Sequence, residues 1–214
     1  MRLRFDQQLE ELKKELILMG SLCESAIALC AKALMEGNLT LAGEVPALSE
    51  RIESKERTIE ELCVKLLLQQ QPVARDLRSI SAALKMVTDM ERIGRQSADI
   101  ADIVSAGAIS GDEDLGAIHA MALSAANMVT DSIDAFVKSD EALARSVIAQ
   151  DDIVDRAFDT IKKSLIRRLG ENRTDGESAL DLLMIAKYLE RLGDHAVNIA
   201  HWVIYSITGT LESE

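Results

Sequence analysis

Apolar residues recur at alternating spacings of four and three along most of the chain, which is typical of long helices packed in a bundle. The apolar seam is longest in the first segment, and similar seams run from Ile118 to Ala135 and from Val154 to Leu165. The pattern predicts an all-α protein with helix over at least ~70% of its residues, against about a third in an average globular protein. The first seam consists of Phe5, Leu9, Leu12, Leu16, Met19, Cys23, Ala26, Cys30 and Ala33.

Six long helices are expected, separated by segments that contain glycine or proline. A short helical piece at residues 39–45 precedes the second long helix, which should end near Pro72 because proline disfavours helical geometry in the residue before it. The third helix is expected from about Val73 to Ser105 and the sixth from Ser178 to Ile207. The other breaks are expected at Gly37-Asn38, in the glycine-containing stretch 107–116 and in the segment GENRTDGES at 170–178.

The two halves of the chain repeat each other. LTLAGEV at 39–45 matches EALARSV at 141–147, and MERIGRQSADIAD at 90–102 matches LERLGDHAVNIAH at 189–201, with offsets of 102 and 99 residues. Duplicated supersecondary units pack as repeats of one architecture. The sequence therefore predicts two tandem three-helix bundles related by a pseudo-two-fold axis, residues 1–108 and 109–214.

The composition limits the environment and the partners. With 36 acidic against 24 basic side chains the net charge is −12, which repels nucleic acid and favours cations or basic partners. Cys23, Cys30 and Cys63 form an odd set without a C-x-x-C, so we expect buried, reduced thiols in a cytoplasmic protein, with a metal or redox pair as the alternative. No uninterrupted apolar run approaches the ~18 residues of a membrane span, and the charged N-terminus argues against a signal peptide.

Acidic stripes in the second repeat are the candidate chemistry. Glu190, Asp194 and Asn198 follow one another at steps of four, with His201 three further on, so they share one face of a helix. The preceding helix carries Asp151, Asp155 and Asp159 at the same spacing. Carboxylates crowded at this spacing repel one another unless a cation lies over them. The stripes predict a site for a hard or borderline metal built from Asp151, Asp155, Glu190 and Asp194, and a salt-bridged surface is the alternative.

The first repeat offers a poorer version of the same site. Glu53, Glu91 and Asp99 remain as candidate ligands, whereas Arg95 and Ser49 stand at the positions of Asp194 and Asp151. Two carboxylates are lost and one positive charge is gained, so an ion pair of Arg95 with Glu91 or Asp99 competes with metal binding there. The two repeats are therefore expected to differ in metal affinity.

Motifs of known enzyme classes are absent. The sequence contains no glycine-rich phosphate loop and no G-x-S-x-G, and it lacks the paired Glu-x-x-His of di-iron bundles. We therefore expect a protein that is not an enzyme, with metal-dependent phosphoester hydrolysis as a distant alternative. Gly94 and Gly193 are expected in mid-helix, at a cost of about 1 kcal/mol each relative to alanine. Close helix packing explains them best, and room for a ligand or a backbone bend beside the acids is the alternative.

QQPVARDLRSISAALK at 70–85, ERIG at 91–94, LERLGDHAVNIA at 189–200 and the duplicated three-helix pattern closely resemble the PhoU family of bacterial phosphate-transport regulators. The resemblance covers essentially the whole chain. It implies a cytoplasmic homodimer that reduces phosphate-starvation signalling, acting between the ATPase subunit of the phosphate ABC transporter and the phosphate-sensing histidine kinase. It also implies surface multinuclear metal sites built on E-x-x-x-D motifs and on aspartates of the preceding helix.

Carried onto this chain, the family pattern is kept at Asp151, Asp155, Glu190 and Asp194, whereas Glu91 lacks its partner because Arg95 replaces it. The implied cofactor is a divalent or trivalent metal cluster, and oxygen ligands leave iron, zinc, manganese and magnesium all open. The alternative function is a helical adaptor of the same fold for another transporter or kinase, with solvated acids and no role for metal.

Overall fold

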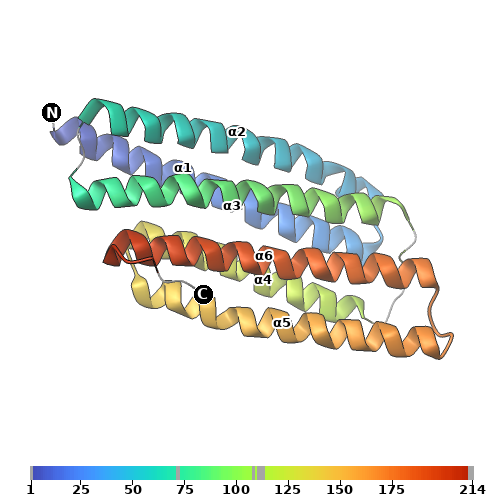
Figure 1. Cartoon of the computed structure of the whole chain (residues 1–214). Coiled ribbons are helices and arrows are strands. Elements are labelled where there is room, and N and C mark those ends of the chain that lie inside the picture. Colours follow the sequence, from blue (N-terminus) through green and yellow to red (C-terminus); the bar gives the residue numbers. More distant parts are fainter. Residues whose placement is uncertain (1, 71–72, 108, 110–113, 212–214) are drawn as a thin grey trace.

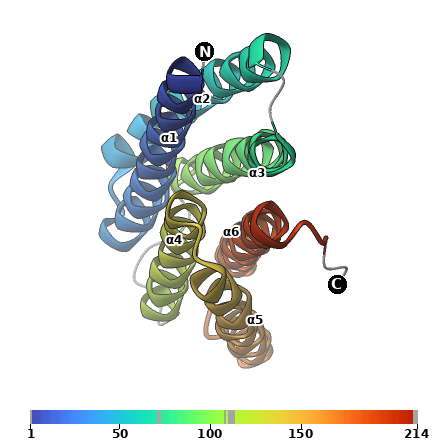
Figure 2. The ribbon, with the colours of Figure 1, turned by 90° about the vertical axis from the view of Figure 1, so that its left-hand side faces the viewer.

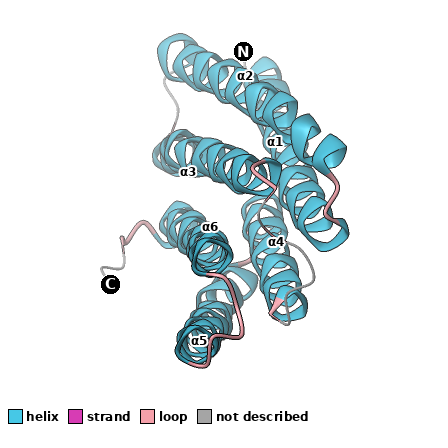
Figure 3. Ribbon diagram, turned by 90° about the vertical axis from the view of Figure 1, so that its right-hand side faces the viewer, coloured by secondary structure: helices cyan, strands magenta, loops and turns pink. Residues whose placement is uncertain are grey.

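The computed structural model describes residues 2–70, 73–107, 109 and 114–211, and these residues form six long helices. This confirms the predicted all-α class and its helix count, and Figure 3 shows helices joined only by loops within the described ranges. The helices are α1 (Arg2–Glu36), α2 (Leu39–Gln70), α3 (Ala74–Ser105), α4 (Leu115–Lys138), α5 (Glu141–Gly170) and α6 (Gly176–Thr208).

The helices form two three-helix bundles that lie against each other along their length (Figure 1). Helices α1, α2 and α3 pack together, α4, α5 and α6 do the same, and the halves meet where α3 packs on α6 and α1 on α4. Outer helices α2 and α5 contact only their own half, as the end-on view in Figure 2 shows. The boundary between 108 and 109 stays a prediction, because residue 108 lies outside the described residues.

The predicted apolar seams form the core. Of the nine seam positions in α1, all are buried except Leu9, which is partly buried and packs against the core. Cys23, Cys30 and Cys63 are buried and form no disulfide, as expected, and burial raises the pKa of the Cys30 and Cys63 thiols to about 12. Thiols held protonated in this way are unreactive and serve as small apolar core residues.

Helix α1 corrects the expectation about membrane spans. By length and composition alone, its segment Phe5–Glu36 is apolar enough to cross a membrane. A search for an uninterrupted apolar run misses this segment because Glu24 and Lys32 break the run. Half of the most apolar window is buried inside the bundle, where α1 packs on α2, α3 and α4. The apolar residues of α1 therefore build the centre of this fold.

Helix α2 is continuous where a separate short piece was expected. Pro46 lies inside it and cannot donate the backbone hydrogen bond that a helical residue at this position would make. Ala42 and Val45 before the proline and Ile52 after it are all buried, so core packing keeps the two parts in one helix. The expected break at Pro72 falls outside the described residues, and α3 begins just after it, at Ala74.

Candidate metal centre

One broad face of the molecule carries both acidic clusters. Helices α2, α3, α6 and α5 lie side by side across it in that order, with α1 and α4 behind them (Figures 1 and 2). The pseudo-two-fold relation therefore puts one cluster between α2 and α3 and the other between α5 and α6. The joint between the repeats, α3 against α6, separates them.

The α5–α6 cluster brings together the four acids that the sequence analysis preferred. Burial, together with the charges of Asp155, Asp194 and Glu190, raises the pKa of Asp151 to about 6. Burial also raises the pKa of Asp155 and of Asp194, with Glu190 the largest charge acting on each. The charge of Glu190 thus acts on all three aspartates, and Lys187 offsets part of the repulsion at Asp155 and Asp194.

Asp151 has an unsatisfied oxygen beside a glycine. Its Oδ1 is buried without a hydrogen-bond partner. A Cβ at Gly193 would lie 2.9 Å from this oxygen and 3.4 Å from Val154 Cγ1, so glycine makes room for the carboxylate. In the first repeat, a Cβ at Gly94 would lie 2.8 Å from Ile52 Cδ1. Both mid-helix glycines therefore serve close packing, as expected, but only Gly193 packs against an acid.

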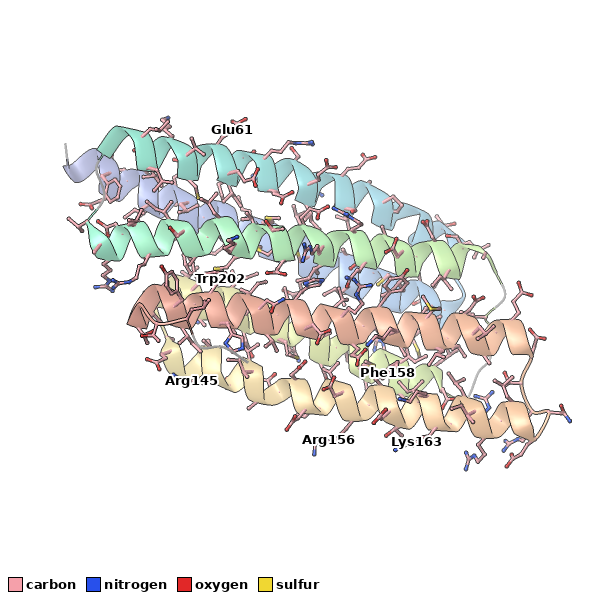
Figure 4. The ribbon with its side chains drawn as sticks, in the orientation of Figure 1. Glu61, Arg145, Arg156, Phe158, Lys163 and Trp202 are labelled. Carbon is pink, nitrogen blue, oxygen red and sulfur yellow. The ribbon has the colours of Figure 1, made fainter. Side chains whose placement is uncertain are left out.

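Lysines compete with a cation for the α5–α6 cluster. Lys187 forms an ion pair with Glu190, and its Nζ lies 5.2 Å from the centre of the Phe158 ring, which points from α5 toward α6 (Figure 4). Within the described residues, no three His, Cys, Asp or Glu side chains converge on a single metal position. Metal binding therefore requires Glu190 to leave Lys187, an exchange that costs little because ion pairs at the surface are weak.

Three further residues of the acidic stripes, Asp159, Asn198 and His201, lie in different surroundings from the four preferred acids. Asp159 pairs with Lys162, which lowers the pKa of its carboxyl. Asn198 turns toward the other repeat and donates to Asp89 Oδ1 at 3.5 Å. His201 keeps a buried Nδ1 without a hydrogen-bond partner within the described residues. Of these three side chains, only His201 has no hydrogen-bond or ion-pair partner within the described residues.

Two acids of the α2–α3 cluster are already paired with arginines. Arg95 forms an ion pair with Glu91, and Arg57 forms one with Glu53, Nη1 to Oε1 at 2.9 Å. Glu56, which the sequence analysis missed, joins this cluster: burial raises the pKa of its carboxyl, and Glu91 adds to the effect. Its spacing of three from Glu53 on the same helix was the signal that could have identified it.

Asp99 lies in different surroundings from the other first-repeat candidates. Burial raises the pKa of its carboxyl, and the charges that act on it come from Asp102, Arg95 and Arg191. It lines a cavity between α3 and α6 together with Arg95 and Arg191. Neither Glu53 nor Glu91 is among the residues that line this cavity.

A buried polar network, also missed from the sequence, joins α3 to α6. His195 Nδ1 lies 2.8 Å from Asp89 Oδ1, and His195 Nε2 lies 3.1 Å from Gln96 Nε2. All three residues are buried, at most 8% exposed. Because a carboxylate can only accept, His195 Nδ1 carries the proton, and in the neutral ring Nε2 accepts from Gln96. Gln96 and His195 are equivalent positions of the two repeats, so this contact lies at the pseudo-two-fold axis.

The stability of the metal-free folded protein is expected to depend on pH, because the pKa of Asp151 is raised in the folded state. Asp151 titrates at about pH 6 when folded and at about 3.9 when unfolded, so between these values only the folded protein keeps the proton. Stability should therefore fall as the pH rises from about 4 to about 7. Urea unfolding in chelator across this range should show the fall, and Asp151→Asn should reduce it. Asp159→Asn is the matched control, and an Asp151→Asn slope equal to that of the parent would contradict the assignment.

Comparison with known proteins identifies the fold. The sequence matches the PhoU domain twice, at residues 16–104 and again at 118–203. The chain belongs to the PhoU family. A phosphate-specific transport system accessory protein PhoU homolog from Pseudomonas putida is 36% identical over 209 residues, covering 97% of this chain and 82% of that protein. The homolog from Clostridium acetobutylicum is 34% identical and covers 96% of this chain and 94% of its own length.

Solved PhoU structures share the whole architecture. The crystal structure of PhoU from Pseudomonas aeruginosa superposes with a TM-score of 0.91 at 33% identity, over 96% of this chain and all of that one. The crystal structure of the phosphate transport system regulatory protein PhoU from Streptococcus pneumoniae gives a TM-score of 0.89 at 25% identity. The match covers 98% of this chain and 100% of that one. The two PhoU domain matches correspond to the two bundles, and the resemblance drawn from the ER-[IL]-G motifs is confirmed.

Proposed function

We propose that this PhoU-family protein is a regulatory accessory component of phosphate uptake that reduces phosphate-starvation signalling. The observation that carries the proposal is the near full-length similarity to accessory proteins of phosphate-specific transport, in sequence and in fold. Their names describe accessory and regulatory proteins, which supports a non-enzymatic role for this chain. The protein acts in the cytoplasm as a homodimer and contacts protein partners, not nucleic acid.

The same proposal includes a metal cluster on the α5–α6 face. Asp151, Asp155, Glu190 and Asp194 would hold it, and the unsatisfied buried Oδ1 of Asp151 fits a cation that accepts oxygen ligands. Iron, zinc, manganese and magnesium all suit this donor set. When bound, the metal supplies positive charge that removes the repulsion between the acids and ties α5 to α6. Glu53 and Glu91 of the other repeat form the weaker site, because Arg95 already neutralises Glu91.

The proposed partners are the ATPase subunit of the phosphate ABC transporter and the phosphate-sensing histidine kinase. A protein with a net charge of −12 favours basic surfaces on such partners and is repelled by a phosphate backbone. Charge complementarity at an interface rim makes an association salt-sensitive. The link between transporter and kinase through this protein is therefore expected to weaken as ionic strength rises.

A pull-down with purified components tests this function. The immobilised full chain should retain the phosphate transporter's ATPase subunit or the sensor kinase at moderate ionic strength and release it at high salt. It should not retain the ATPase subunit of an unrelated ABC transporter, which is the matched control, or duplex DNA. Retention of DNA with neither phosphate-system protein retained would contradict the proposal.

The second candidate is an adaptor of the same fold for a different transporter or kinase, without metal. It is favoured by the absence of converging metal ligands in the described residues and by the pairing of Glu190 with Lys187. Genomic neighbourhood separates the two functions. Genes of a phosphate transporter beside this one support the first, and genes of an unrelated transporter support the second.

A further inference from the structure

A cavity of about 460 Å³ opens between α3 and α6, at the joint of the two repeats. Helices α3 and α6, whose residues line it, lie between α2 and α5, and so between the two acidic clusters (Figure 1). Its chemistry is opposite to theirs, because three of its lining residues are the arginines Arg92, Arg95 and Arg191. Asp99 is the one acidic residue in the described lining.

Two of these arginines form no direct ion pair within the described residues, although the charge of Arg191 acts on Asp99. Arg92 and Arg191 are equivalent positions of the repeats, each following the glutamate of its ER-[IL]-G motif. Within the described part of the chain, neither forms an ion pair or a hydrogen bond with another side chain. Arg95 differs, since it pairs with Glu91. The duplication thus brings two guanidinium groups without a direct ion-pair partner in the described residues to one cavity on the pseudo-two-fold axis, with Asp99 as the acid beside them.

One of the residues that line the cavity, Gln96, adds a buried acceptor. Gln96 donates to His195 through Nε2 and leaves its Oε1 buried without a partner. In the neutral ring of His195, the hydrogen bond to Asp89 fixes this orientation, because His195 Nε2 can then only accept from Gln96. Such an unsatisfied oxygen costs on the order of 1–3 kcal/mol unless a ligand or water donates to it. Asp99 provides a second acceptor at the same cavity.

We propose that this cavity binds a phosphoryl oxyanion, with Arg92 and Arg191 on its charged oxygens and Gln96 Oε1 accepting from its hydroxyl. Guanidinium groups match the geometry of phosphate oxygens and stay charged at every accessible pH. A group that combines negative oxygens with one O–H satisfies both the arginines and the acceptor. Inorganic phosphate as the monohydrogen ion has this combination, and so does a terminal phosphate of a nucleotide when protonated.

The acceptor Gln96 Oε1 also predicts that the cavity distinguishes phosphate from sulfate. Sulfate has the size and charge of monohydrogen phosphate but no hydrogen to donate, so it would leave Gln96 Oε1 unsatisfied and place its oxygens against the Asp99 carboxylate. A site built to accept a ligand's O–H discriminates strongly against an analogue that lacks it. Phosphate should therefore bind more tightly than sulfate.

Calorimetric titration of the purified full chain tests the proposal. Inorganic phosphate, sulfate and a nucleoside triphosphate are titrated separately at constant ionic strength, in chelator, so that phosphate held by a metal at the acidic clusters makes no contribution. The expected result is saturable binding of about one phosphate per chain, with sulfate at least about tenfold weaker. The triphosphate titration separates free phosphate from a nucleotide as the source of the same phosphoryl group.

Variants locate the site. Arg92→Gln with Arg191→Gln should weaken phosphate binding at least about tenfold, and circular dichroism should show unchanged folding because both side chains are exposed. Arg145→Gln is the matched control: it removes one positive charge from the outer helix α5 (Figure 4), which does not contact α3. Loss of binding in the double variant alone supports the site. No saturable binding of either phosphate ligand by the parent, or equal affinity in parent and double variant, overturns it, whatever the pull-down of partner proteins shows.

Discussion

Replacing Glu190 and Asp194 together by alanine is expected to remove most of the metal that the protein binds and the thermal stabilisation that accompanies it. These two residues are half of the four-carboxylate cluster, and their charges add to the effect of burial, which raises the pKa of Asp151 to about 6. A ligand that binds only the folded state raises stability by an amount that grows with the logarithm of the ratio of its concentration to its Kd, so a lost site appears as a lost shift in Tm. Metal per chain after dialysis, with Tm in metal and in chelator, measures both.

The matched variant is Glu91→Ala, which changes the equivalent glutamate of the first repeat. It should change bound metal little, because Glu91 is already paired with Arg95. Arg95→Asp should have the opposite effect, since it removes the guanidinium and restores the carboxylate that stands at Asp194 in the other repeat. Equal metal loss from the Glu91 variant and the double variant would show that the repeats do not differ in the way proposed here.

Gly94→Leu is expected to destabilise the protein by about 2 kcal/mol, a loss of several degrees in Tm. A Cβ there would lie 2.8 Å from Ile52 Cδ1, 3.1 Å from Cγ2 and 3.2 Å from Cβ. The Cβ of Ile52 is fixed by the backbone of α2, so the clash cannot be relieved by rotating a side chain. The gain in helix propensity, about 1 kcal/mol, offsets only part of the cost.

Gly193→Ala should behave differently, because its new Cβ meets the end of the Asp151 side chain. That carboxylate can rotate away, so stability should be unchanged or slightly higher while metal binding falls. Gly43→Ala controls for helix propensity, since its Cβ would meet nothing within 4 Å. Thermal unfolding and bound metal are measured for Gly94→Leu, Gly193→Ala and Gly43→Ala and compared with the parent protein. A Gly193→Ala protein that is destabilised and keeps its metal would contradict the role given to this glycine.

The fold could be predicted from the sequence because helix period and core burial depend on the same residues. The seam of α1 and its counterpart in α4 are buried where the spacing placed them, and the repeat offsets predicted the two-bundle arrangement. Pro46 shows the limit of local rules. Proline weakens a helix locally, but burial of Val45 and Ile52 on either side keeps α2 continuous.

The candidate site was only partly predictable, since spacing along one helix does not reveal which neighbour a side chain meets. Asp99 and Asn198 occupy equivalent stripe positions, yet both turn toward the joint of the repeats, where Asp99 lines the arginine cavity and Asn198 reaches Asp89. The unpaired charge of Arg92 and Arg191 is likewise a property of the α3–α6 packing. The pairing of Arg95 with Glu91, by contrast, follows from a spacing of four, and the sequence analysis anticipated it.

The most direct test of the metal centre is anomalous diffraction from crystals of the full chain grown with a transition metal and without chelator. The account predicts a strong anomalous peak between α5 and α6, bounded by Asp151, Asp155, Glu190 and Asp194, with Glu190 turned away from Lys187. A weaker peak near Glu53 and Glu91, or none there, agrees with it. A peak at Glu53 and Glu91 with none between α5 and α6, or no peak at either cluster under any loading, would contradict it.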